Sequence, residues 1–587
     1  MNITKHQKCC VLIFVVASFL LLWKLDYAPF WNPDEGRYAA ASMEMIAPLP
    51  GETSSWIIPH LNTLPRLNKP PLVYWTTATF YRLFGTHTWS ARLTSAIASI
   101  GIMALLWWLA LAIWGKAQGH RKAFFIMLVW ATALLPFALS RILNTDMLLT
   151  FATTLMLIAI WRTAEDQPSW RAFAAAAIGL ALALLAKGPV GLALPLLIVL
   201  VWLIMVKKKY FYRYFVEHKW SVLLAFIAGI GLAAPWYLAV NRERPGFLAH
   251  FILYENLGRF SGEKEYHDPS SPLFYLPVLL IGLFPWTLFL GTAAVNFWRE
   301  RLQPTRETRA RLFLWIWALL IVFFFSASST KLITYILPAL PAFAFLLGDA
   351  IAEFRLPQRS WQWAILLSAA LAAIMGIVML AAPYLKPILK LAPAATLQQA
   401  LWGGGAILLL GAIGVWAAIK SPSWQLKIMG SAALLFTLFF PSAAGHFSPY
   451  EDISAIFIRL RSQLLPEDQI VEIRTFQPTV IFYAKRPVTV IDQPNTSGYN
   501  QHEFDTSPLF AKPLSAVYTM PAQKNRVFVL VKWREFPPGL RQLPLHYWAG
   551  NNDYALLSNR PAPAGWPIEF ISPGKRSKII PFPSHAN

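Results

Sequence analysis

Apolar runs of about twenty residues recur along the chain from Val11 to Phe440, with shorter polar stretches between them. A helix needs about 20 apolar residues to cross the hydrocarbon core of a bilayer. Within 172–206, the central Lys187-Gly188-Pro189 favours two helices over one long one. The pattern predicts thirteen spanning helices, near residues 11–25, 92–114, 123–140, 146–161, 172–187, 189–206, 220–240, 272–295, 312–328, 332–351, 361–382, 400–419 and 427–444.

Composition supports a polytopic membrane protein. Of 587 residues, 56% are hydrophobic and 14% are charged, whereas about 25% are charged in an ordinary soluble domain. This excludes a soluble multidomain enzyme, a disordered chain, a collagen and a coiled coil. The only cysteines, Cys9 and Cys10, are adjacent and give neither a disulfide framework nor a metal site with the usual spacing. No small-x-small cleavage site follows the first apolar run, so we expect an anchor and not a cleaved signal peptide.

In a soluble protein, a net charge of +22 would suggest a polyanionic partner such as nucleic acid. In a membrane protein, the side of the membrane on which the Lys and Arg residues lie has to be considered first. With the N-terminus inside, most Lys and Arg of the short loops fall on the cytoplasmic side, as the positive-inside rule requires. This layout places the C-terminus outside. The short outer connections carry few cations, namely Arg141, Lys187, Lys331, Lys386 and Lys390.

The remaining polar segments lie outside the membrane in this layout: the loops 26–90 and 241–271 and the tail 445–587. The tail contains strand-like runs bounded by Pro, Asn, Asp and Gly, near residues 470–473, 479–483, 488–491 and 526–533. We therefore predict a transmembrane domain over residues 1–444 and a soluble mixed α/β domain over residues 445–587.

The first outer loop carries the densest charge cluster. Asp34, Glu35 and Arg37 follow the first span directly, where charge at a membrane surface is usually functional. The alternative is that Asp34 only caps an interfacial helix that runs to about Ile46. Farther along the loop, Lys69 precedes two prolines, as either a solvated turn residue or a point charge for a phosphate.

Several other outer ends carry cations. Each of them alone is more often a snorkelling helix-end residue than a ligand-binding group. Together they place positive charge on a face that the topology should deplete of cations, which suggests an anionic ligand at the outer boundary of the membrane. The cations in question are Lys69, Arg141, Lys187, Arg259 and Lys331.

Seven short motifs follow one another along these outer ends. They are Trp-x-Pro-Asp-Glu-Gly-Arg-Tyr-Ala (31–39), Lys-Pro-Pro-Leu-x-Tyr-Trp (69–75), Asn-x-Asp (144–146), Ala-Lys-Gly-Pro (186–189), Glu-Asn-x-x-Arg-Phe (255–260), Phe-Pro-Trp (284–286) and Lys-Leu-x-Thr-Tyr-Ile-Leu-Pro (331–338). In this order they resemble the bacterial lipid A aminoarabinose transferases, C-type glycosyltransferases related to the protein O-mannosyltransferases. The resemblance covers about residues 10–350.

The resemblance implies a C-type glycosyltransferase fold and transfer of 4-amino-4-deoxy-L-arabinose from undecaprenyl phosphate to lipid A phosphate at the periplasmic face of the inner membrane. It implies that Asp34 lies next to the reacting sugar, that Lys69, Arg259 and Tyr335 hold the donor phosphate, and that Arg37, Asp146 and Lys187 line the cavity. We further predict that Asp34, Asp146 and Glu35 are catalytic carboxylates and that Tyr38, Lys331 and His267 also line the cavity. Members of that family commonly have Glu directly before the lysine at position 69. This chain has Asn68 there, which leaves a different sugar open.

Physical chemistry supports such a site without the family name. A polyprenyl phosphosugar loses a phosphate monoester, whose growing negative charge fixed cations such as Lys69 and Arg259 would stabilise. Asp34 would take a proton from a hydroxyl acceptor, or would orient an already ionised phosphate and stabilise positive charge at the anomeric carbon. Direct displacement would invert that centre without a second nucleophilic carboxylate.

We expect no required cofactor, and a monomer. A divalent metal on His267 with Glu263, Glu265 or Asp268 remains an alternative that rests on spacing alone. The other functional alternatives are a polyprenyl-phosphosugar transferase acting on protein Ser/Thr or on another envelope glycan, and a transporter of a lipid-linked sugar. A transporter usually shows repeat symmetry, and none is visible in the sequence. A structural scaffold would not explain the cluster of Asp34, Glu35 and Arg37.

Overall fold

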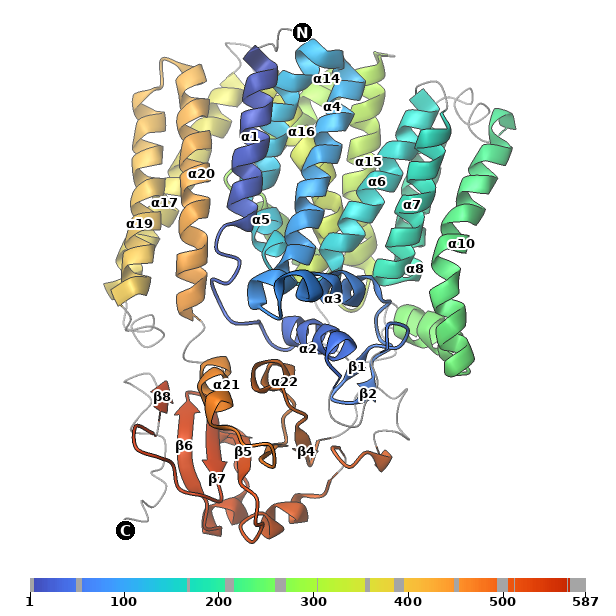
Figure 1. Cartoon of the computed structure of the whole chain (residues 1–587). Helices are drawn as coiled ribbons and strands as arrows, with labels where there is room; N and C mark the ends of the chain where they lie inside the picture. The colour runs from blue at the N-terminus through green and yellow to red at the C-terminus, as the bar shows by residue number, and fades with distance from the viewer. Residues whose placement is uncertain are drawn as a thin grey trace.

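The computed structural model describes residues 5–48, 55–165, 169–205, 216–258, 271–303, 305–353, 359–384, 395–447, 453–493, 505–510, 512–566 and 568–570. A helical bundle forms one end of the molecule and a sheet forms the other (Figure 1). The N-terminus lies at the bundle end that points away from the sheet (Figure 1).

Eight helical segments in the described residues are long and apolar enough to cross a membrane. They are α1 (Lys5–Leu22), α4 (Thr88–Thr132), α6 (Thr145–Glu165), α7 (Trp170–Lys187), α10 (Lys219–Glu243), α15 (Arg306–Ala327), the segment Ile333–Ala352 formed by the 3₁₀ turn η4 (Ile333–Ala339) and α16 (Leu340–Ala352), and Gln362–Ala381 within α17 (Arg359–Ala381). Further helices of the bundle are α5 (Leu134–Ser140), α8 (Pro189–Met205), α13 (Tyr275–Gly282), α14 (Phe289–Glu300), α19 (Ala395–Ala417) and α20 (Pro422–Phe447).

The predicted span 272–295 is not one helix. The structure breaks it into α13 and α14 around Phe284-Pro285-Trp286, because proline has no N–H to continue the helical ladder. Trp286 turns inward instead, and its indole N–H donates to Thr132 Oγ1 at 2.9 Å. In contrast, the structure has the predicted break between α7 and α8, where Gly188 takes a φ of +70°.

Two short helices lie across the bundle end that faces the sheet: α2 (Asp34–Ile46) and α3 (Leu72–Phe84) (Figure 1). The connection between them contains the small hairpin β1 (His60–Leu61) and β2 (Leu64–Pro65). Pro33 occupies the N-cap of α2, and no side chain caps this helix. Asp34 is therefore the first helical residue and not the cap, so the purely structural alternative for it does not apply.

The sheet has six strands in the order β4-β3-β5-β7-β6-β8. Their bounds are β3 (Gln469–Ile473), β4 (Thr489–Ile491), β5 (Val527–Lys532), β6 (His546–Asn551), β7 (Tyr554–Ser558) and β8 (Ile568–Phe570). The prediction of a strand at 479–483 is wrong, because the structure has helix α22 (Pro478–Ala484) there. β3 and β4 pair in parallel, and parallel neighbours need a crossover, usually a helix.

The C-terminal sheet region is preceded by α21 (Ser454–Leu460), while the expected domain boundary at 444 and 445 falls inside α20. Short helical turns complete the structure: α11 (Phe247–Ala249), the π-helix η2 (His250–Gly258), and the 3₁₀ turns η3 (Pro272–Phe274), η5 (Ala382–Tyr384), η6 (Arg461–Gln463), η7 (Leu514–Thr519), η8 (Trp533–Glu535) and η9 (Pro538–Gln542).

Helix α22 of the sheet region packs directly on α2. Asn32 Nδ2 donates to Thr479 Oγ1 at 2.8 Å, and the side chain of Asn62 exchanges two hydrogen bonds of 2.8 Å with the backbone of Val488. A Cβ on Gly36 would lie 2.7 Å from Thr479 Cγ2. Only glycine permits this approach, so α2 is held between the bundle and the sheet region.

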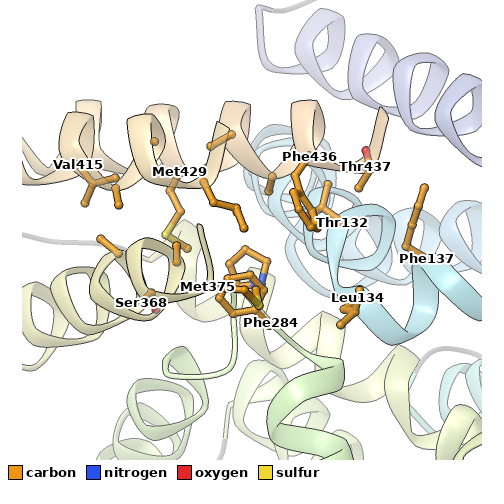
Figure 2. Close-up of a pocket in the computed structure, with 18 residues that line it drawn as sticks. Thr132, Leu134, Phe137, Phe284, Ser368, Met375, Val415, Met429, Phe436 and Thr437 are labelled. Carbon is orange, nitrogen blue, oxygen red and sulfur yellow. The ribbon is translucent and has the colours of Figure 1, made fainter. Parts of the chain in front are cut away.

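An apolar cavity of about 100 Å³ lies between α17, α19, α20 and the junction of α4 and α5. Figure 2 shows Met375, Met429 and Phe436 pointing into it, with Phe284 from the broken span closing one side. Its lining is almost entirely hydrophobic and includes none of the predicted site residues. The cavity belongs to the packing of the bundle and not to the candidate site.

Candidate active site

Asp34 and Arg37 lie one turn apart at the start of α2 and face outward. Arg37 Nη1 is 3.3 Å from Asp34 Oδ1, and the two side chains are 38% and 66% exposed, respectively. Burial and the neighbouring Arg66 lower the pKa of the Arg37 guanidinium, and Asp34 acts against both. Two guanidinium groups therefore share the surroundings of one accessible carboxylate.

Asp146 and Lys187 form a buried ion pair between α6 and α7. Asn144 Oδ1 accepts the N–H of Met147 at 2.7 Å and so caps α6, which places Asp146 in the first turn of that helix. Lys187 is the last residue of α7, and its Nζ lies 4.3 Å from the centre of the Tyr335 ring. The structure thus brings three predicted site residues from separate segments together.

Tyr38 joins the two groups. Its side chain is buried next to Tyr74, with the ring centres 5.9 Å apart. Burial raises the pKa of Tyr38, and the nearby charges of Asp34 and Asp146 raise it further, while Arg66 opposes them. The α2 cluster and Asp146 therefore act on the same phenol. Sequence analysis did not select Arg66 or Tyr74, although both lie within or beside the motif at 69–75.

Lys69 is half-buried in the turn that precedes α3. Its neighbour Asn68 donates through Nδ2 to Glu255 Oε1 at 3.3 Å. Glu255 is buried, and His250 Nε2 lies 3.9 Å from the same oxygen. Sequence analysis quoted Glu255 only as part of a motif. Its contact with position 68 places a carboxylate beside the lysine.

Glu35 has a different role from the predicted catalytic one. It is fully buried, and its two carboxylate oxygens accept from Arg92 Nε at 3.0 Å and from Arg92 Nη2 at 2.8 Å. They also accept the N–H groups of Trp31 at 2.9 Å and of Leu143 at 2.7 Å. A carboxylate with four such donors and no solvent access is unsuited to proton transfer, so we correct its assignment to a positioning role.

Arg141 also departs from the prediction that it faces an anionic ligand. Its buried guanidinium donates to the backbone carbonyls of Leu20 at 2.8 Å and Lys24 at 2.8 Å, and also to those of Leu21 and Trp23. The sequence showed it as one more outer cation, but it binds the end of α1. Lys331 is likewise buried, and its Nζ donates to the carbonyl of Ser328 at 2.7 Å.

Arg259 and His267 lie outside the described residues, as do Glu263, Glu265 and Asp268. Among the residues that are described, no three His, Cys, Asp or Glu side chains gather as a metal site would require. The donor-phosphate role of Arg259 and the metal alternative thus both remain predictions.

The family model for dolichyl-phosphate-mannose-protein mannosyltransferases matches residues 68–237. An undecaprenyl phosphate-α-4-amino-4-deoxy-L-arabinose arabinosyl transferase of Aeromonas salmonicida is 31% identical over 354 residues, 60% of each chain. One from Erwinia tasmaniensis is 28% identical and aligns with 72% of this chain and 75% of its own length. The resemblance to the aminoarabinose transferases is confirmed.

Solved structures show a similar fold in three dimensions. The crystal structure of ArnT from Cupriavidus metallidurans bound to undecaprenyl phosphate superposes with a TM-score of 0.77 at 23% identity and covers 94% of this chain and 98% of that one. The apo form gives a TM-score of 0.76. The chain is therefore a polytopic helical membrane protein with the ArnT fold. In sequence, its alignment spans about 60% of the length of the first curated relatives.

Proposed function

We propose that the protein transfers a sugar, 4-amino-4-deoxy-L-arabinose, from undecaprenyl phosphate to a phosphate of lipid A. The reaction takes place at the periplasmic face of the bacterial inner membrane, and the protein acts as a monomer. The observation that carries the proposal is the gathering of Asp34, Arg37, Asp146, Lys187 and Tyr335 at one end of the bundle. The names of the relatives support the choice of donor and sugar.

In the proposed step, the bond between the sugar C1 and the donor phosphate oxygen breaks as a bond forms between C1 and an oxygen of the acceptor phosphate. Undecaprenyl phosphate leaves with the electron pair, and the anomeric centre inverts. An ionised acceptor phosphate has no proton to lose. Asp34, as the accessible carboxylate, then orients the acceptor and stabilises the positive charge that develops at C1.

The leaving phosphate needs cations and hydrogen-bond donors. Lys69 and Arg259 are proposed to supply the charge, and Tyr335 a hydrogen bond. Asp146 holds Lys187 over the face of the Tyr335 ring, which restricts the directions in which the phenol can point. These fixed charges suffice for the proposed chemistry without a cofactor, because the leaving group is itself the anion that they stabilise.

Asn68 is relevant to which sugar the site selects. Its hydrogen bond with Glu255 places a buried carboxylate next to position 68, so the site keeps a negative charge that can attract a cationic amino group.

Glu255→Gln should raise the KM for an aminosugar donor about fivefold and leave the KM for a neutral sugar donor unchanged. Asn68→Gln, which keeps the amide, is the matched control. Equal changes for both donors would remove Glu255 from sugar selection.

The family model matched at 68–237 favours a second acceptor class, protein Ser or Thr. Mass spectrometry of lipid A and of glycopeptides from cells with and without the protein separates the two. A mass gain on lipid A phosphates that disappears on deletion supports the main proposal. Altered glycopeptides with unchanged lipid A would replace it with the second candidate.

A further inference from the structure

A pocket of about 470 Å³ with a mixed polar and apolar lining lies where three segments meet. One wall is the α1–α2 linker, the second is the α3–α4 connection with the start of α4, and the third comes from α21, η6, α22 and the residue that follows α22. The volume is within the range of roughly 300–1,000 Å³ for small-molecule sites. No residue of the candidate active site lines it among those described.

The C-terminal wall of this pocket is cationic. Arg461 and Lys485 both line it and are exposed. Lys485 Nζ is 2.9 Å from Thr86 Oγ1 on the opposite wall, so its charge is directed across the pocket. Partial burial lowers the pKa of Lys485, and the nearby Arg461 lowers it further. Asp26 is the one acidic side chain among the described residues that line the pocket, which leaves an excess of positive charge.

The pocket opens at the level where the lipid-facing side of α1 ends. Leu12, Val15 and Phe19 of α1, with Trp23 directly after its end, recur at helical spacing and are 64%, 57%, 53% and 40% exposed, as lipid-facing positions should be. The pocket begins three residues after Trp23, at Asp26. A lipid whose chains lie along α1 therefore has its headgroup beside the pocket.

The pocket rim has the composition of a membrane boundary. Ile458 lines the pocket one turn before Arg461 and is 55% exposed. Phe84 is also exposed, and its ring lies 5.6 Å from that of Trp89, which lines the pocket. Aromatic and aliphatic side chains around cations are typical of protein surfaces that contact lipid headgroups.

We propose that this pocket binds the phosphate group of a lipid headgroup. The lipid is either the phosphorylated acceptor of the proposed reaction or an anionic phospholipid of the bilayer, since both present the same chemistry to Arg461 and Lys485. The pocket is next to the site, because Tyr27 in its wall lies 4.9 Å from the Arg92 guanidinium that pairs with Glu35. Where the lipid is the acceptor, the inference rests on the proposed function.

The test measures lipid binding to the purified full-length protein by native mass spectrometry. The ligands are lipid A, dephosphorylated lipid A, phosphatidylglycerol and phosphatidylcholine. The double variant Arg461→Ala with Lys485→Ala should bind at least one of the two anionic lipids about thirtyfold more weakly, because each surface cation contributes roughly fivefold near a membrane. Its binding of dephosphorylated lipid A and phosphatidylcholine should not change.

The matched control is Lys524→Ala with Arg541→Ala, which removes two exposed cations of the same region that do not line the pocket. It should bind every lipid as the unaltered protein does. Arg461→Lys should retain most of the binding, since it keeps the charge. If the double variant misfolds, Arg461→Gln alone, at an exposed position, should still weaken binding about fivefold.

Loss of lipid A binding alone would identify the acceptor as the source of the phosphate. Loss of phosphatidylglycerol binding, alone or together with that of lipid A, would identify headgroups with a net anionic phosphate, since the choline of phosphatidylcholine balances the charge of its phosphate. Unchanged binding of both anionic lipids to the double variant and to Arg461→Gln would overturn the proposal. Because binding needs no transfer, absent sugar transfer with intact charge-dependent binding would remove the proposed function and leave the pocket.

Discussion

Both ends of the helical bundle contain charged side chains, but they use them differently. α4 leaves the α3 end, reverses near Gly115 and places Lys122 at the opposite end. There Lys122 Nζ lies 2.6 Å from both Asp349 Oδ1 and Glu353 Oε1. Arg311 binds the same two acids and Glu300. Every one of these charges has its partners within the protein.

At the α2 end the partners are incomplete. Asp34 has 66% of its side chain exposed and one ionic contact of 3.3 Å with a half-exposed arginine. Bidentate, buried pairs there, such as Glu35 with Arg92, lie directly behind the exposed residues. We infer from this comparison that saturated networks hold the helices, and we expect the chemistry to depend on the charges left accessible in front of them.

The largest expected effect is on Asp34. Asp34→Asn should lower the rate of sugar transfer by about a hundredfold or more, the size typical of a lost catalytic carboxylate, with unchanged thermal unfolding. Initial rates with purified polyprenyl phosphosugar measure it, and Glu467→Gln, an exposed acid of the C-terminal region, is the control. Near-normal transfer by Asp34→Asn would show that accessible charge does not identify the catalytic group.

Glu35 sharpens the comparison because it is the neighbour of Asp34 in sequence. Arg92→Met leaves the buried carboxylate of Glu35 without its bidentate partner, and removing one member of a buried pair costs about 3 kcal/mol or more. We expect that loss in the free energy of unfolding, measured by denaturation in detergent micelles. Equal stability with lost activity would return Glu35 to the catalytic residues.

At the opposite end, Arg311→Met should lower the free energy of unfolding by about 3 kcal/mol for the same reason. The KM and kcat of the folded fraction should not change. Arg474→Met, which breaks an exposed pair with Asp492, should change stability by less than about 1 kcal/mol. A kinetic defect in the folded Arg311→Met variant would show that the charges at the two ends of the bundle do not differ in role.

Lys187 tests the middle case, a buried pair inside the candidate site. Lys187→Ala should lower kcat/KM for the donor about thirtyfold, because Asp146 loses its partner and Tyr335 loses the cation on its ring. Lys116→Ala, at the far end of the bundle, should leave kcat/KM unchanged. Should Lys187→Ala only destabilise the protein, the pair would belong with the saturated networks.

The smallest effect concerns the contact that positions α2. Gly36→Ala places a Cβ against Thr479 and should cost about 1 kcal/mol, as overpacking does. Thr479→Ser removes the methyl group concerned and should restore part of the loss. Additive destabilisation in the double variant would mean that the two residues are not in contact.

Local signals in the sequence were sufficient to predict many helices and helix breaks of the bundle. Lys187-Gly188-Pro189 predicts the break between α7 and α8, because the residues that cause it are adjacent. The helix α22 was mistaken for a strand because its β-branched and aromatic residues also suit a strand, and only the parallel pairing of β3 with β4 requires a helix there.

In the candidate site, too, the sequence could identify some residues and not others. Asp34, Arg37, Asp146 and Lys187 could be selected because charges at an outer membrane boundary are unusual in any sequence. Glu35 could not be separated from Asp34, since its partner Arg92 lies 57 residues away. Arg141 looked like the other outer cations for a similar reason, because the four carbonyls that it binds carry no sequence signature.

The packing of α22 on α2 also has a consequence for biosynthesis. Asn32 and Thr479, which join the two helices, are separated by 447 residues. At roughly 5–20 residues per second, a ribosome needs about twenty seconds to a minute and a half between them. During that interval α2 and Asp34 lack one of their two supports. The candidate site therefore gains this second support only after residue 479 has been synthesised.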